Sequence, residues 1–327
     1  MYRRRVACEH QHWPYQQPIA LSRGVLTGQD VIVVTIAQHG VIGRGESSPH
    51  HRYSETPEQS LHEIEGLIPA LEAGLDRAAL QQALTAGAAR NAVDCALWDL
   101  EAKLTKTRVW ELAEVAPPRP TLTSQTIGLD APATMASVAA RAWSPVLKLK
   151  LGGTADIECV RAVREAAPGA RIVVDANEAW TLTQLEDFAA AVVSCDVELI
   201  EQPLRAGNDS QLDNLRMAIP LGADESFHGA ELFERTRDRY QVVNIKLDKT
   251  GGLTEALRVK AEAQRRGFRI MVGCMGGTSL AMAPAMLLAN EASFVDLDGA
   301  RLLQTDRSPG LHYDGGIIGA FDADVWG

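Results

Sequence analysis

The chain has 327 residues, of which 46% are hydrophobic and 23% are charged, so it can bury a large core and is not expected to be disordered. The formal net charge is -10 and the run Arg3-Arg4-Arg5 is the only basic cluster, which argues against a nucleic acid as partner. We expect no signal peptide, because no apolar segment of the required length follows this basic run, and no membrane association, because no stretch approaches the about 18 uncharged apolar residues of a transmembrane helix. Five scattered cysteines without a CxxC spacing fit a reducing compartment, so we expect a cytoplasmic protein.

Residues 1–118 predict an α+β domain. The β-branched run at residues 30–36 is typical of a strand, and residues 40–46 resemble its hairpin return. Pro57 then opens a stretch with apolar residues at three- and four-residue steps, which indicates one buried helical face. A second helical stretch shows the same steps. The proline-rich segment at residues 117–120 ends this pattern and marks a domain boundary.

Residues 119–304 change to short β-branched runs that alternate with helical segments. The runs are apolar throughout, as expected where both faces of a parallel sheet are covered. Most end in a charged residue, and these residues recur at nearly regular intervals with room for a helix in each. The sequence therefore predicts an α/β fold, a modified TIM barrel of the (β/α)7β type, with an α+β capping domain that the tail at about 305–327 completes. The eight predicted barrel runs are residues 122–127, 146–150, 172–175, 199–201, 221–224, 242–246, 270–272 and 294–297.

Three carboxylates stand at the carboxyl ends of successive predicted strands, where this barrel type places its chemistry. They are Asp175, Glu201 and Asp224. Gathered at one mouth, they would repel one another strongly unless a cation lay between them. An all-oxygen ligand set with room for water and substrate favours Mg2+ over zinc, and calcium would usually require more ligands. The alternative is that each carboxylate caps the following helix or forms a salt bridge in a loop.

Lysines end the second and the sixth predicted barrel strands. Side chains alternate along a strand, so Lys148 and Lys150 share a face, as do Lys246 and Asp248. The two strands face each other across a barrel of eight, so we expect Lys150 and Lys246 to flank the metal from opposite sides. Such a pair suits removal of a proton from one face of a carbon and its return to the other. Burial and nearby positive charge are expected to lower the lysine pKa, whereas the alternative role is an ion pair with the metal-binding carboxylates.

Five short motifs resemble, in order and spacing, the muconate-lactonising subgroup of the enolase superfamily. They are Lys148-Leu149-Lys150, Asp175-Ala176-Asn177, Glu201-Gln202-Pro203, Asp224-Glu225 and Lys246-Leu247-Asp248. The resemblance covers essentially the whole chain. It implies a Mg2+-dependent reaction in which the metal stabilises an enediolate formed by loss of the proton α to a carboxylate. Lys150 and Lys246 would be the catalytic pair. Substrate-binding or supporting roles would fall to Lys148, Asn177, Glu225 and Asp248.

Two further features resemble the dipeptide epimerases of that subgroup. Asp296 and Asp298 at the eighth strand look like paired aspartates that hold the free α-ammonium group of a dipeptide. Arg23, in the loop after the first strand, resembles an arginine that clamps the side-chain carboxylate of a glutamate. The resemblance implies a small dipeptide substrate, with L-Ala-L-Glu first, epimerised at its second residue, and a setting in the recycling of cell-wall peptides. The alternatives are a loop or helix-cap role for the aspartates and a plain surface role for Arg23.

Some questions stay open at the level of the sequence. The segment His50–Tyr53 either closes over the site or forms a solvated loop. Gly276-Gly277 stands where family members often carry larger residues, which leaves the pocket for the first amino acid undefined. The alternative functions are a dipeptide epimerase of another specificity, an o-succinylbenzoate synthase, an N-acylamino-acid racemase and a non-catalytic barrel that binds an acid. The chain either acts alone or forms a homo-oligomer.

Overall fold

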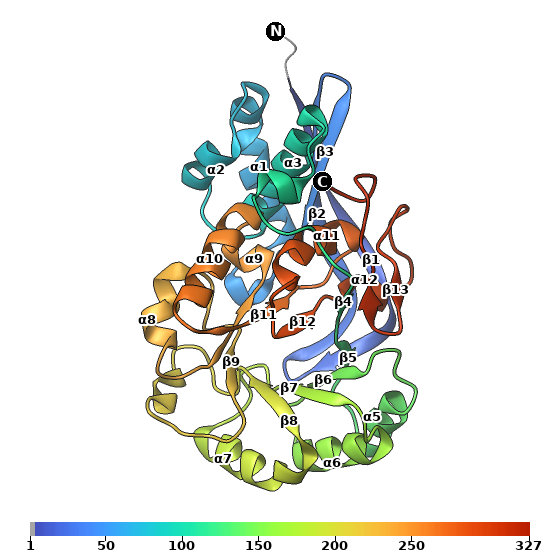
Figure 1. The fold of residues 1–327 in the computed structure, drawn as a ribbon, viewed down its shortest axis with the longest axis vertical. Helices are drawn as coiled ribbons and strands as arrows, with labels where there is room; N and C mark the ends of the chain where they lie inside the picture. The colour runs from blue at the N-terminus through green and yellow to red at the C-terminus, as the bar shows by residue number, and fades with distance from the viewer. Residues whose placement is uncertain (1–3) are drawn as a thin grey trace.

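The computed structural model describes residues 4–327, and Figure 1 shows a capping domain at one end of a barrel. Arg3 of the basic run lies outside the described residues. The capping domain begins with a three-stranded antiparallel sheet in the order β1 (Arg5–Leu21), β2 (Gly24–Gln38) and β3 (Val41–Ser47). Its helices are α1 (Pro57–Glu72), α2 (Arg77–Ala83), α3 (Ala88–Thr105) and α4 (Val109–Leu112).

The hairpin of β1 and β2 is longer than the sequence indicates. The β-branched run at residues 30–36 is the part of β2 that packs on the helices, with Ile32 and Val34 fully buried. β1 and the first part of β2 are largely exposed and carry many polar residues, so no apolar alternation marks them as strands. The hairpin reaches the barrel, where the Leu129 N–H donates to the Ala20 carbonyl at 2.8 Å.

Eight parallel strands form a nearly closed barrel, as predicted. Hydrogen-bonded neighbours follow chain order from β5 to β12. Across the seam between these two strands, the Ser124 N–H donates to the Val295 carbonyl at 2.9 Å, and the Leu297 N–H donates to the Thr123 hydroxyl at 2.8 Å. The strands are β5 (Gln125–Ile127), β6 (Val146–Lys150), β7 (Arg171–Asp175), β8 (Val197–Glu201), β9 (Leu221–Ala223), β10 (Val242–Ile245), β11 (Arg269–Gly273) and β12 (Phe294–Asp296).

The predicted first barrel run, residues 122–127, divides between two sheets. Its beginning belongs to β4 (Thr121–Leu122), which pairs with β14 (Ile317–Ile318). β14 in turn pairs with β13 (Tyr313–Asp314), so these three strands form a small antiparallel sheet. The change of sheet occurs between Thr123 and Ser124. The Thr123 N–H still donates to the Gly316 carbonyl, beside the small sheet, whereas the Ser124 N–H donates to Val295 of the barrel.

Helices cover the outside of the barrel (Figure 1). They are α5 (Pro132–Ala139), α6 (Asp156–Ala166), α7 (Leu182–Ala191), α8 (Phe233–Thr236), α10 (Leu253–Arg265) and α11 (Ser279–Ala289). Two single helical turns, α9 (Leu247–Thr250) and α12 (Gly299–Leu302), lie instead against the capping domain. Single 3-10 turns occur at η1 (His51–Tyr53), η2 (Val193–Cys195), η3 (Asp209–Leu212) and η4 (Ala230–Leu232). Within residues 4–327, no helix combines the length and the apolar character needed to cross a membrane.

The end of the chain lies against the capping domain. Trp326 is fully buried, and its indole N–H donates to the carbonyls of Arg44 and Cys95 at 3.1 and 3.2 Å. The Gly327 N–H donates to the Asp99 carboxylate at 2.7 Å. The domain boundaries at residues 118 and 305 stay predictions.

Candidate active site

The inward-facing residues of the barrel form two layers of opposite character. The lower layer is an apolar cluster of Val173, Leu199, Val242, Met271 and Phe294. Side chains alternate along a strand, so residues two positions further on face the same way, and here four of the five are polar, with Gly273 as the exception. Strand pairing places Asp175 level with Lys150 on one side and with Glu201 on the other. This polar layer, at the carboxyl ends of the strands, is the candidate site.

Lys148 lies among the acidic groups of the polar layer. Its Nζ is 2.6 Å from Asp296, 2.7 Å from Glu201 and 3.3 Å from Asp175. Burial lowers the pKa of Lys148, but the surrounding carboxylates outweigh that effect and hold the pKa well above its ordinary value. Lys148 therefore remains a cation that neutralises part of the acidic cluster.

Lys150 and Lys246 approach one pocket from strands on opposite sides of the barrel. Lys150 Nζ donates to Asp175 and Lys246 Nζ donates to Asp224, both at 2.7 Å. Burial lowers the pKa of Lys246, but the Asp224 carboxylate and its neighbours reverse the shift, so the net change is upward. The sequence-based expectation of a lowered pKa assumed a bound metal ion nearby, and the protein groups alone shift the pKa of this lysine in the opposite direction. That expectation counted repulsion by a cation, whereas the charge nearest to Lys246 is a carboxylate.

The predicted metal ligands Asp175, Glu201 and Asp224 face the same layer, where lysines pair with them. Among residues 4–327, no three acidic, histidine or cysteine side chains converge closely enough to hold one ion. Glu201 nevertheless has a buried oxygen, Oε2, without a hydrogen-bond donor, because Lys148 Nζ is near it but outside hydrogen-bonding geometry. Its other oxygen accepts from Asn244 at 2.6 Å. Glu201 Oε2 thus has an ion-pair partner but no hydrogen-bond donor, and a carboxylate oxygen of this kind beside other carboxylates fits a hard cation such as Mg2+.

A pocket of about 110 Å3 opens above the polar layer. Most of the predicted site residues line it, whereas Asp175 and Glu201 lie beneath it and Asp248 lies elsewhere. The predicted residues that line it are Arg23, Lys148, Lys150, Asn177, Asp224, Glu225, Lys246, Asp296 and Asp298.

Asp296 and Asp298 border the pocket, and each already has partners within the protein. Asp296 accepts from the Ser124 hydroxyl at 2.5 Å and from Lys148 at 2.6 Å. Asp298 accepts from the Thr126 N–H at 2.7 Å. Burial and the neighbouring Asp296 raise the pKa of Asp298 to about 7. The pair therefore presents less free negative charge than two isolated aspartates would.

Arg23 follows the first strand, as the sequence indicated, and occupies the two-residue turn at the tip of the β1–β2 hairpin. Its Nη1 donates to Glu178 at 3.0 Å and its Nη2 donates to Glu225 at 2.9 Å. Glu225 also accepts a long hydrogen bond of 3.5 Å from Asn177. The structure thus brings a guanidinium group to the rim of the pocket and holds it between two acids.

Comparison with known proteins identifies the family. The description "Mandelate racemase / muconate lactonizing enzyme, N-terminal domain" matches residues 3–113, and "Enolase C-terminal domain-like" matches residues 131–316. The chain belongs to the enolase superfamily. The L-Ala-D/L-Glu epimerase of Escherichia coli (strain K12) is 40% identical to it over 318 residues, 96% of this chain and 99% of that protein. The N-acetyl-D-glutamate racemase of a Pseudoalteromonas species is 43% identical over 303 residues, 91% of this chain and 95% of that protein.

Solved structures of the superfamily have the same fold. An enolase family member from Agrobacterium tumefaciens, described as homologous to dipeptide epimerases and holding sodium and L-Ala-L-Glu, is 46% identical with a TM-score of 0.97 over 99% of this chain and 100% of that one. A dipeptide epimerase from Enterococcus faecalis V583, in complex with Mg and L-Leu-L-Tyr, is 26% identical with a TM-score of 0.90 over 98% of both chains.

Asp248 lies outside the pocket of this enolase-superfamily site. β10 ends one residue before Lys246 and a helical turn begins one residue after it, so the predicted shared strand face does not exist. The Asp248 carboxylate instead accepts from the Ser48 N–H and the Asn91 amide, both at 2.9 Å and both from the capping domain. Asp248 therefore ties the barrel to the cap.

Lys249 is a buried lysine that the sequence analysis overlooked. Its Nζ donates to Oδ1 and to the carbonyl of Asp224, both at 2.7 Å, and to the Asn244 carbonyl at 2.8 Å. Burial lowers its pKa. In the sequence, Lys249 is marked only by its position three residues after Lys246. In a helical turn such as α9, this spacing places two side chains on the same face. Lys249 therefore binds one carboxylate oxygen of Asp224, Oδ1, while Lys246 binds the other, Oδ2.

The segment His50–Tyr53 and Gly276, whose roles the sequence left open, both lie at the pocket. His50, Arg52 and Tyr53 line it, so this part of the cap closes over the site. Gly276 has φ of 107°, and a Cβ atom there would stand 2.4 Å from the Gln29 side chain. A larger residue at this position would therefore require Gln29 to move.

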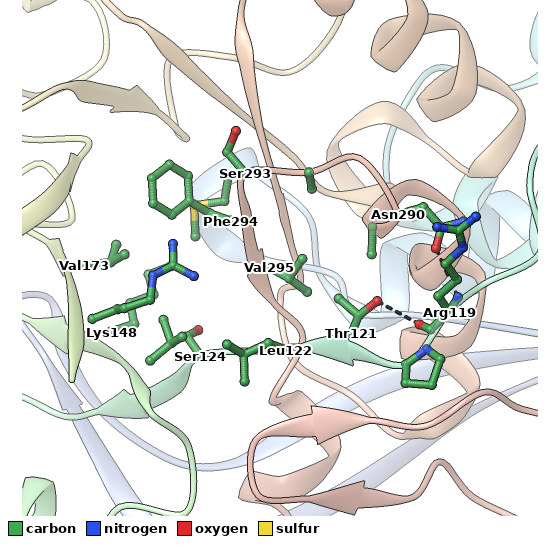
Figure 2. Close-up of a pocket in the computed structure, with 16 residues that line it drawn as sticks. Arg119, Thr121, Leu122, Ser124, Lys148, Val173, Asn290, Ser293, Phe294 and Val295 are labelled. Carbon is green, nitrogen blue, oxygen red and sulfur yellow. Dashed lines mark hydrogen bonds between the residues drawn. The ribbon is translucent and has the colours of Figure 1, made fainter. Parts of the chain in front are cut away.

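A second cavity, of about 300 Å3, lies at the amino ends of the strands (Figure 2). Val173 and Phe294 of the apolar layer border it, and the stem of Lys148 reaches both this cavity and the pocket. None of its lining residues is acidic. The groups suited to proton transfer therefore lie in the pocket at the opposite end of the barrel.

Proposed function

We propose that this chain is a Mg2+-dependent dipeptide epimerase, with L-Ala-L-Glu as its leading substrate and inversion at the second residue. The observation that carries the proposal is the placement of Lys150 and Lys246 on opposite sides of one pocket above a layer of carboxylates. The similarity to the Escherichia coli L-Ala-D/L-Glu epimerase over nearly the whole chain supports this choice. Such a reaction makes the chain an isomerase that acts on an amino acid derivative.

The proposed mechanism is a two-lysine proton transfer. When bound, Mg2+ would be held by Asp175, Glu201 and Asp224 and would stabilise the negative charge that develops at the substrate carboxylate. Lys150 or Lys246 removes the α-proton from one face, and the opposite lysine returns a proton to the other face. A lysine can act as a base only after giving up its own proton, so the ion pairs with Asp175 and Asp224 must loosen during turnover.

The remaining pocket residues would bind the substrate. Lys148 adds positive charge near the reacting carboxylate, and Asn177 orients the groups around it. Asp296 and Asp298 accept hydrogen bonds from the α-ammonium group. Arg23 receives the side-chain carboxylate of the second residue.

The cellular setting is part of the proposal. Dipeptides of this kind arise when cell-wall peptides are recycled, and an epimerase would make both isomers available for further breakdown. All five cysteines are free thiols, which is compatible with a cytoplasmic location. We place the protein there as a monomer or homo-oligomer that binds neither nucleic acid nor membrane.

Exchange of the α-proton tests the proposed function directly. Purified protein is incubated with L-Ala-L-Glu in deuterated water with Mg2+, and deuterium at the second α-carbon and the appearance of L-Ala-D-Glu are followed by NMR. We expect both signals, and we expect a chelator to abolish both. The double variant Lys150→Ala/Lys246→Ala is the background control. Absence of exchange with any dipeptide would reject a dipeptide epimerase, and absence of exchange with N-acylated glutamate as well would favour a barrel that only binds acids.

Racemisation of an N-acylated glutamate is the second candidate function. N-acetylglutamate keeps the glutamate and the amide bond of L-Ala-L-Glu but carries an acetyl group, which has no ammonium, in place of the alanyl residue, and the Pseudoalteromonas relative is named for N-acetyl-D-glutamate. Asp296 and Asp298 already have internal partners, so a ligand without an ammonium group leaves neither of them without a donor. The same NMR experiment with N-acetyl-L-glutamate decides between the two. If Asp298→Asn impairs only the dipeptide reaction, the ammonium is the natural ligand of this pair.

A further inference from the structure

Glu178 joins two separate segments of the capping domain to the barrel. It lies in the loop after β7, and its two oxygens accept from Arg52 Nε and Nη2, both at 2.6 Å. Oε2 also accepts from Arg23 Nη1 at 3.0 Å. Arg23 is at the tip of the β1–β2 hairpin and Arg52 is in η1, so one carboxylate anchors both segments that border the pocket.

The carboxylate of Glu178 is held firmly. Its side chain is only 7% exposed, and Oε1 also accepts from the Ala206 N–H at 2.7 Å. Two parallel hydrogen bonds to one guanidinium group fix its orientation as well as its distance. The backbone of Glu178 has φ of 69°, in the left-handed region that residues other than glycine seldom adopt. Its N–H donates to the Gln202 carbonyl at 2.9 Å, which stabilises this turn.

The barrel surface is also shaped to receive the tip of the hairpin. Gly152 has φ of 116°, and a Cβ atom at this position would stand 2.7 Å from Cβ of Ser22. The Ser22 hydroxyl lies 3.5 Å from the Asn177 carbonyl, one residue before Glu178. The tip that carries Arg23 is therefore seated against the same loop that carries the anchoring carboxylate.

Arg23 binds two acids, Glu178 and Glu225, which differ in how many hydrogen bonds they accept. Nη1 is bound by Glu178, which has four donors in total, and Nη2 is bound by Glu225. Glu225 keeps a second buried oxygen, Oε2, without any donor. An acid that enters the pocket and replaces Glu225 at Nη2 leaves Nη1 on Glu178. The guanidinium group would then keep its position while it changes its partner.

We propose that Glu178 positions Arg23 for the side-chain carboxylate of the substrate and, through Arg23 and Arg52, holds both cap segments closed over the pocket. The first half rests on the proposed function, because it assigns a ligand to Arg23. The second half, the anchoring of two cap segments, does not depend on it. Glu178 touches no reacting atom in this scheme, so it is a positioning residue.

The variant Glu178→Gln tests the positioning of Arg23 by comparing two substrates. We expect KM for L-Ala-L-Glu to rise by about tenfold or more while kcat changes by less than about threefold, because the lost interaction acts on binding. For L-Ala-L-Gln, which lacks the side-chain charge, we expect KM to change by less than about threefold. Equal losses with both substrates would overturn the positioning role.

Glu198→Gln is the matched control. Glu198 forms the same kind of two-bond pair with Arg171, at 2.9 and 2.7 Å, on the outside of the barrel. This variant removes a carboxylate from an arginine without touching the cap, so neither KM is expected to change. A similar rise in KM in the control would mean that the effect of Glu178→Gln is not specific to the anchor.

Trypsin gives a second readout that does not depend on activity. It cleaves after arginine, and the bonds that follow Arg23 and Arg52 lie in the two anchored segments. We expect both bonds to be cut about fivefold faster in Glu178→Gln than in the wild type, because local opening exposes them. Arg52→Gln leaves Glu178 in place and keeps the test available if Glu178→Gln does not fold. In Arg52→Gln, Glu178 loses the two hydrogen bonds that fix its orientation, so we expect faster cleavage after Arg23.

The two readouts separate the anchor from the proposed function. Faster cleavage in a protein that exchanges no α-proton in any dipeptide would support the anchor and reject the epimerase. Unchanged cleavage after Arg23 in both variants, together with an unchanged KM, would overturn the anchor whatever the activity of the wild type.

Discussion

Lys148 and Asp296 form an ion pair across the seam of the barrel, with Nζ and Oδ2 2.6 Å apart. Lys148 belongs to β6 and Asp296 to the last strand, β12, while β5 stands between them in the closed ring. The Ser124 hydroxyl, just before β5, donates to the same aspartate at 2.5 Å. β5 and β12 are not paired as neighbouring strands of the sheet. The polar layer therefore helps to hold the barrel closed at this seam.

Replacing Lys148 by methionine is expected to destabilise the fold strongly. The change leaves three buried carboxylates without their common counter-charge, and breaking a buried pair in this way costs about 3–5 kcal/mol. Urea denaturation in the presence of a chelator measures the loss. The control is Lys260→Met, whose ammonium pairs at 3.3 Å with the exposed Glu291 and is expected to contribute less than about 1 kcal/mol. Equal losses in the two variants would contradict the central position of Lys148.

Each pocket lysine is expected to exchange the α-proton of one epimer only. With Lys150→Ala, interconversion of the epimers should stop, because no group remains on one face of the carbon. The epimer whose proton faces Lys246 should still take up deuterium, and Lys246→Ala should show the opposite preference. NMR of both epimers in deuterated water, with both single variants, measures this. Deuterium uptake from both epimers in either single variant would contradict the two-sided mechanism.

Loss of the Glu201 carboxylate is expected to abolish tight binding of Mg2+. Glu201→Gln keeps the size of the side chain but removes the charge at Oε2, the buried oxygen without a donor. We expect the dissociation constant for Mg2+, measured by calorimetry, to rise by at least about a hundredfold. Glu198→Gln is again the matched control, since it lies on the same strand but is partly exposed on the outside. Unchanged Mg2+ binding in Glu201→Gln would remove this residue from the ligand set.

The polar layer could be predicted from the sequence because it follows from strand periodicity alone. Asp175 and Glu201 come two residues after Val173 and Leu199, which fill the barrel, so the alternation of side chains decides their direction. The barrel itself was predicted from the same pattern, because short apolar runs that end in a charged residue recur along the chain. That reasoning stops where a strand stops, which is why it failed for Asp248.

Other features depend on partners that are distant in the chain. The exposed part of β1 is a strand because it pairs with β2, and its own residues show no strand pattern. The division of residues 122–127 between two sheets depends on Gly316, which lies almost at the other end of the chain. Glu178 lies in a turn, and its two arginines are 155 and 126 residues away. No local pattern records such contacts.

Asp248 is expected to make the stability of the protein fall as the pH rises. It is buried, and burial raises its pKa from 3.8 to about 7 in the folded state. Between these values the folded chain binds a proton that the unfolded chain has released, so the free energy of unfolding decreases with pH. One pKa unit corresponds to about 1.4 kcal/mol, so the full effect is about 4 kcal/mol, present below pH 4 and lost above pH 7.

Asp248→Asn isolates this contribution, because asparagine has no charge to desolvate and its oxygen can still accept from Ser48 and Asn91. We expect the variant to match the wild type near pH 4 and to exceed it in stability by up to about 4 kcal/mol at pH 8, as measured by urea denaturation. Asp238→Asn removes the same charge from an exposed turn and serves as the reference. The opposite outcome is that both variants change the free energy of unfolding by the same amount at every pH. Ionisation of Asp248 would then cost nothing in the folded state, and its burial between cap and barrel would have no effect on stability.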